Sequence, residues 1–63
     1  MTNYQNCKLQ LKETAKIAKK EFKNDKPAIR QAINNNTHAL CGDYNLSEYK
    51  TNLLHNYAAS LHP

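Results

Sequence analysis

The stretch YQNCKLQLKETAKIAKKEF, residues 4–22, decides the fold class of this 63-residue chain. Its apolar and small residues recur in steps of three and four, which places them on one face of an α-helix. This stripe consists of Tyr4, Cys7, Leu11, Ala15, Ala18 and Phe22. The pattern predicts a first helix over residues 3–23.

A second helix is predicted over residues 26–41. Asp25 can cap its first turn, where Pro27 is tolerated because the amide that proline lacks has no partner there. Gly42 is expected to end the helix in the left-handed conformation, and the three asparagines at 34–36 are expected to bend or fray its middle. The residues at core spacing are Ile29, Ala32, Ile33, Thr37 and Leu40.

A third helix is predicted over residues 46–62. Asn45 and Glu48 have the spacing of a capping box, and Tyr44 and Tyr49 that of a hydrophobic staple around it. The expected apolar face is Leu46, Tyr49, Leu53, Tyr57 and Leu61. With one glycine, two prolines and no alternating β-branched run, nothing indicates a strand. We therefore predict one all-α domain, residues 1–63, of three short helices.

A chain of this length hides only about 60% of its unfolded surface, so small domains commonly add disulfides, a metal or a second subunit. Cys7 and Cys41 are too few for a disulfide framework. The pair His38 and Cys41 is the only close set of soft ligands, and structural zinc normally needs two such pairs. We expect no metal and no cofactor. Of these three ways to stabilise a small domain, oligomerisation is the one left open.

The first stripe is about five turns long, and the later helices offer too little surface to cover it, which predicts an intertwined helical homodimer. Leu11, Ala15, Ala18 and Phe22 are expected at the contact between subunits. The full set predicted to form the core or the dimer interface is Tyr4, Cys7, Leu11, Ala15, Ala18, Phe22, Ile29, Ile33, Leu40, Tyr49, Leu53 and Tyr57.

The charge of the chain is concentrated in its first segment. Residues 1–26 hold seven basic and three acidic groups and residues 27–63 hold two of each, so the net charge of +4 belongs to the first segment. A basic face beside the apolar stripe can attract phosphates or an acidic protein, or it can simply be solvated. The lysines of this face are Lys8, Lys12, Lys16, Lys19, Lys20 and Lys23.

Neither an enzyme nor a sequence-specific DNA reader is indicated. A catalytic thiol needs a paired base and a third positioned group, and the three histidines are spread along the sequence and expected at the surface. Base readout favours arginine, asparagine or glutamine on an element that fits the groove. The chain has one arginine, Arg30, and a helix-turn-helix reader built on the third helix would carry only Lys50 as a base.

No run of residues reads as a secretion signal or a membrane span, so we expect a soluble cytoplasmic protein without membrane partners. The block KPAIRQAINNNTHALCGDYNLSEYK (26–50), followed by LLHNYAASLHP (53–63), resembles the small helical proteins encoded in the early region of lambdoid bacteriophages, between the exonuclease and excisionase genes. The resemblance covers most of the chain.

The resemblance implies an accessory phage protein that acts in the host cytoplasm through host or phage proteins, influencing host cell-cycle timing, prophage induction and the choice between lysis and lysogeny. It carries no functional residues over to this chain. The preferred function is therefore non-enzymatic protein–protein interaction. A small basic nucleic-acid-binding regulator is the alternative.

Overall fold

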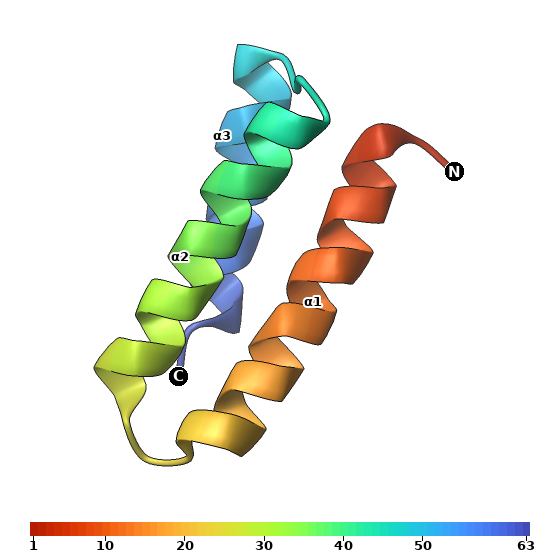
Figure 1. The fold of residues 1–63 in the computed structure, drawn as a ribbon. Helices are drawn as coiled ribbons and strands as arrows, with labels where there is room; N and C mark the ends of the chain where they lie inside the picture. The colour runs from red at the N-terminus through yellow and green to blue at the C-terminus, as the bar shows by residue number, and fades with distance from the viewer.

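Three α-helices make up the fold in the computed structural model, which describes residues 1–63 (Figure 1). Helix α1 spans Asn3–Phe22, α2 spans Lys26–Asp43 and α3 spans Glu48–Leu61. Helix α2 runs antiparallel to α1, and α3 returns antiparallel to α2, lying behind it in Figure 1. The prediction of an all-α chain with three helices is confirmed.

The starts of α1 and α2 are set by local side-chain caps. The Thr2 hydroxyl accepts from the backbone N–H of Gln5 at 3.1 Å, and the Gln5 side chain accepts from the N–H of Thr2 at 2.9 Å. This capping box, which the sequence analysis did not identify, satisfies two otherwise orphaned donors. The prediction that Asp25 caps α2 is confirmed, because its carboxylate accepts from the N–H of Ala28 at 3.2 Å.

The connection between α2 and α3 corrects three predictions. Helix α2 continues through Gly42, which does not adopt a positive φ, and ends at Asp43 instead of residue 41. Asn45 takes the left-handed conformation with φ 49°, which asparagine tolerates better than most residues. Asn45 therefore cannot act as the predicted cap. Ser47 does so instead, accepting from the N–H of Lys50 at 3.2 Å, and α3 starts at Glu48.

The remaining helix ends differ by one residue from the predicted ones: α1 ends at Phe22 and α3 at Leu61. The predicted fraying at residues 34–36 is also wrong, because α2 is helical throughout this segment. Ile33 and Thr37 on either side are fully buried, and the Thr37 hydroxyl donates to the Ile33 carbonyl at 2.7 Å. Tertiary packing thus overrides the weak helix propensity of asparagine.

The core lies where the three helices meet. It comprises Cys7, Leu11, Ala15, Ala18, Ile29, Ile33, Leu40, Leu54 and Ala58, with Thr37 buried among them. The stripe of α1 is therefore covered by helices of the same chain from Cys7 to Ala18. The accessible surface of 4345 Å² is close to the roughly 4,100 Å² expected for a folded monomer of this mass.

This burial contradicts the premise that one chain lacks the surface to cover the α1 stripe. The premise failed because Ala15 and Ala18 are small, so they need little partner area. Of the predicted stripe, Phe22 remains 39% exposed and Tyr4 is half-buried.

Helix α3 packs through residues that the sequence analysis left out. Leu54 and Ala58 are fully buried, whereas Leu53 and Tyr57 are half-buried and Tyr49 is 68% exposed. The predicted face advanced in steps of four, which slowly rotates around a helix of 3.6 residues per turn. The face that meets the core is therefore offset by about one residue from the predicted one.

This offset can be tested by a pair of neighbouring substitutions. Leu54→Ala should lower the free energy of unfolding by about 3 kcal/mol, because it empties a fully buried site. Leu53→Ala should cost less, about 1.5 kcal/mol, since that side chain is only partly buried. Urea unfolding followed by circular dichroism measures both, and equal losses would contradict the packing of α3.

Candidate functional site

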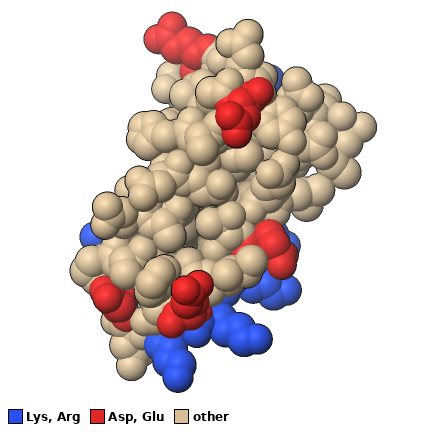
Figure 2. All heavy atoms as spheres, viewed as in Figure 1, with Lys and Arg blue, Asp and Glu red and all other residues tan.

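Six lysines follow the exposed side of α1. Lys8 is half-buried beside α3, and the other five, Lys12, Lys16, Lys19, Lys20 and Lys23, are exposed. In Figure 2 most of the visible basic side chains gather at the lower end of the molecule, where acidic groups lie beside them, and other acidic groups lie at the upper end. The lopsided charge of the sequence therefore becomes a basic edge of the folded protein.

Two lysines lie over tyrosine rings where α1 meets α3. The ammonium of Lys8 is 5.6 Å from the ring centroid of Tyr4 and 5.0 Å from that of Tyr57. The ammonium of Lys50 is 5.0 Å from the centroid of Tyr4 and 6.0 Å from that of Tyr49. We call these five residues the tyrosine–lysine ladder. At exposed sites each such contact is worth about 0.5–1 kcal/mol, so the ladder joins the N-terminal half of α1 to α3.

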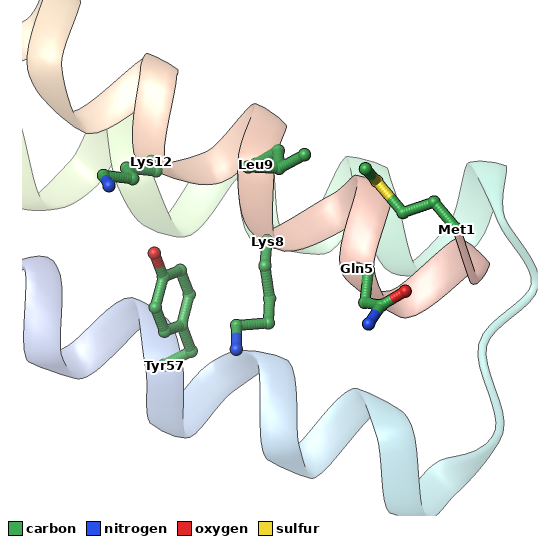
Figure 3. A pocket seen from close by; sticks show the side chains of 6 residues that line it. All are labelled: Met1, Gln5, Lys8, Leu9, Lys12 and Tyr57. Carbon is green, nitrogen blue, oxygen red and sulfur yellow. The ribbon is translucent and has the colours of Figure 1, made fainter.

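Two adjoining hollows follow the same seam, with volumes of about 340 and 520 Å³. They share Leu9 and Lys12, so together they form one continuous depression, which we call the α1–α3 groove. Figure 3 shows the first hollow, with the Lys8 ammonium and the Tyr57 ring in the space between α1 and α3. The remaining lining residues are Met1 and Gln5 in the first hollow, and Glu13, Ala15, Lys16, Lys19 and Leu61 in the second.

Leu9 is the feature of this groove that the sequence analysis missed. Its side chain is 54% exposed and lies among lysines, away from the core stripe of α1. A single exposed leucine is ordinary in a folded protein. Here, however, it lies in a hollow with Leu61 from α3 and basic groups on both sides. The sequence did carry a signal for this residue, because Leu9 stands outside the apolar stripe, between Lys8 and Lys12.

The two cysteines differ in their surroundings. Both are free, and Cys7 is fully buried in the core. Burial raises the pKa of the Cys7 thiol, and the neighbouring Cys41 raises it further. A raised pKa keeps the thiol protonated at neutral pH, which opposes nucleophilic chemistry. No three histidine, cysteine or acidic side chains gather in a way that could hold a metal ion.

Two of the three histidines, which are spread along the sequence, meet in the fold. His38 on α2 and His55 on α3 lie edge to face, with ring centroids 4.9 Å apart. The antiparallel return of α3 along α2 brings these positions together, which spacing along the sequence could not indicate. The contact belongs to the α2–α3 seam and lies outside the α1–α3 groove.

The predicted core or interface residues fall into three environments. Seven are buried within one chain: Cys7, Leu11, Ala15, Ala18, Ile29, Ile33 and Leu40. Tyr4, Leu53 and Tyr57 are half-buried, and Phe22 and Tyr49 are exposed. Contact of these last two with another molecule stays a prediction.

No helix of the structure combines the length and the apolar character needed to cross a bilayer. The chain matches no protein-family model, and searches of curated proteins and of solved structures found no significant similarity. The function is therefore argued from the geometry of the molecule.

The buried thiol of Cys7 predicts an alkaline loss of stability. Its folded-state pKa is raised, so above about pH 8.5 the unfolded thiol releases a proton that the folded one retains. Stability contributed by the protonated thiol is complete below that pH and is lost as the pH rises. The free energy of unfolding should thus fall more steeply between about pH 8 and 10 in the wild type than in Cys7→Ala. Parallel curves would contradict the prediction, and Cys41→Ala should retain most of the slope.

Proposed function

We propose that this protein is a non-enzymatic interaction module that binds a protein partner through the α1–α3 groove. The observation that carries the proposal is the groove itself, where exposed Leu9 lies within a row of lysines. An apolar contact surrounded by charged groups resembles the centre and rim of a protein interface.

A nucleic-acid-binding regulator is the second candidate, because the row of lysines on α1 is basic enough to attract phosphates. Two observations favour the protein partner. The ladder places lysine ammonium groups over the rings of Tyr4, Tyr49 and Tyr57, so those faces are not free platforms for base stacking. In addition, Glu48 stands in the first turn of α3, where it would repel a DNA backbone.

The proposed biological setting rests on the sequence resemblance to phage early-region proteins. In that setting the chain is an accessory regulator in the host cytoplasm. Its partner is a host or phage protein, and binding modulates host processes, prophage induction or the choice between lysis and lysogeny.

We also propose that the protein forms an intertwined homodimer by exchange of α1. The support is backbone strain in the three-residue turn between α1 and α2. Lys23 has φ 51° and ψ −104°, a conformation that costs a non-glycine residue of order 1–3 kcal/mol. Short strained hinges favour exchange of a terminal element between subunits. Opening this hinge would let α1 of one chain occupy the same core position in another.

Sedimentation at micromolar concentration tests the exchange. The wild type should form a dimer, and Lys23→Gly should raise the dimer dissociation constant about tenfold or more, because glycine accepts the closed turn without strain. Lys20→Gly is the matched control, since it weakens α1 equally in the closed and exchanged forms. A wild type that stays a folded 7.2 kDa monomer would contradict the dimer.

Capture of a partner tests the interaction function. The tagged wild type and two variants with a new charge, Leu9→Asp and Ile17→Asp, are compared in nuclease-treated host lysate. Leu9 and Ile17 are both 54% exposed on α1, but only Leu9 lines the groove. A partner retained by the wild type and Ile17→Asp and lost by Leu9→Asp supports the proposal.

A mobility-shift assay at physiological salt runs beside the capture experiment. Salt-sensitive retention of a DNA fragment, with no protein captured through Leu9, would contradict the interaction function in favour of the nucleic-acid candidate.

A further inference from the structure

We propose that the α1–α3 groove takes an acidic amphipathic α-helix of the partner protein. This inference rests on the proposed function and specifies the chemistry of what binds. It follows from three properties of the groove: its length, the spacing of its charges and the apolar residues in its lining.

The groove has the length of a short helix. Its lining on α1 extends from Gln5 to Lys19, which is about 21 Å at a rise of 1.5 Å per residue. A partner helix of about 14 residues, or four turns, would span that distance. The seam between two helices is long and shallow. This shape suits a third helix laid along it, with its apolar face toward the groove.

The charges of the groove repeat at helical spacing. Lys8, Lys12, Lys16 and Lys19 advance in steps of four, four and three, and Glu13 is the one acidic group in the lining. Four lysines against one glutamate leave a charge of +3. Acidic residues repeated in steps of three and four on a partner helix would meet this row along its whole length. Complementary charge of this kind speeds association and fixes the register.

One end of the row is held in position before anything binds. The ammonium of Lys8 lies over the rings of Tyr4 and Tyr57, so its side chain has already lost much of the freedom that an exposed lysine has. Binding there costs less ordering than at a free side chain. A carboxylate reaching Lys8 therefore has a defined position, whereas the exposed lysines further along α1 can adjust to the partner.

The apolar lining residues favour an amphipathic helix over the other possible occupants. Leu9 and Leu61 offer apolar surface, which the apolar face of an amphipathic helix covers and a phosphate backbone leaves exposed. A second copy of this chain fits poorly, because it has a net charge of +4. Its α2 and α3 contain only Asp43 and Glu48 as acidic residues, so neither presents a row of carboxylates.

A synthetic probe tests the inference without knowledge of the natural partner. The probe is a fluorescein-labelled, alanine-rich peptide of about 14 residues, with glutamates in steps of three and four along one face and leucines beside them. Fluorescence anisotropy should show saturable binding to the wild type. The same peptide with every glutamate replaced by glutamine should bind about tenfold or more weakly.

Matched variants locate the binding site. Lys12→Gln/Lys16→Gln should weaken binding about tenfold, whereas Lys20→Gln/Lys23→Gln, with the same loss of charge outside the groove, should change it less than about twofold. Leu9→Ala should weaken it about fivefold and Ile17→Ala less than about twofold, although both side chains are 54% exposed in the wild type. Circular dichroism confirms that each variant is folded.

Three results would overturn the inference. They are an absence of saturable peptide binding, equal loss of binding in the two lysine pairs, and tighter binding of a short DNA duplex through Lys12 and Lys16. Its failure can be told from that of the proposed function. If Leu9→Asp loses a natural partner but the acidic peptide does not bind, the interaction function stands and the acidic helix is wrong.

Discussion

The close packing of α1 against the other two helices is the constraint on which the rest of the structure depends. Ala15 and Ala18 are only 2% and 4% exposed, and such small side chains let neighbouring helices approach at short distance. The large side chains of the core are Leu11 on α1 itself, and Ile29, Ile33 and Leu54 on the other two helices, all of which are fully buried. A 63-residue chain can thus cover its longest apolar stripe from Cys7 to Ala18 with helices of the same chain. Because this stripe must face inward, the orientation of every other residue on α1 follows from it.

That orientation produces the basic edge and the groove together. The lysines at 8, 12, 16 and 19 lie on the side of α1 adjacent to the core stripe, which is the side facing α3. Because α3 reaches α1 there through Tyr57 and Leu61 and through the tyrosine–lysine ladder, the seam is left shallow and open. A row of lysines that would otherwise be a solvated helix face therefore lines a depression together with Leu9 and Leu61. The positive charge alone would have supported either candidate function. The position of Leu9 within the row of lysines favours a protein partner.

Sequence patterns predicted the fold class, the stripe of α1 and the Asp25 cap because each depends on residues close together in the chain. The patterns failed where two nearby residues could each play the same local role at similar energy. Gly42 and Asn45 can both reverse a chain after a helix, and Asn45 and Ser47 can both cap the next one. The outcome depends on which register lets Leu54 and Ala58 reach the core. The contact of His38 with His55 and the groove around Leu9 are tertiary features. Only Leu9, standing off the stripe among lysines, left a trace in the sequence.

The proposed self-association and the proposed partner binding do not compete for the same surface. In an exchanged dimer the stripe of α1 would pack against α2 and α3 of the other subunit, and the core would contain the same residues. The α1–α3 groove lies between those helices, so it would be rebuilt with its lysines from one subunit and with Tyr57 and Leu61 from the other. Each dimer would then present two grooves related by two-fold symmetry. A partner carrying two acidic helices could engage both, and its second contact would be strengthened by the high local concentration that the first one creates.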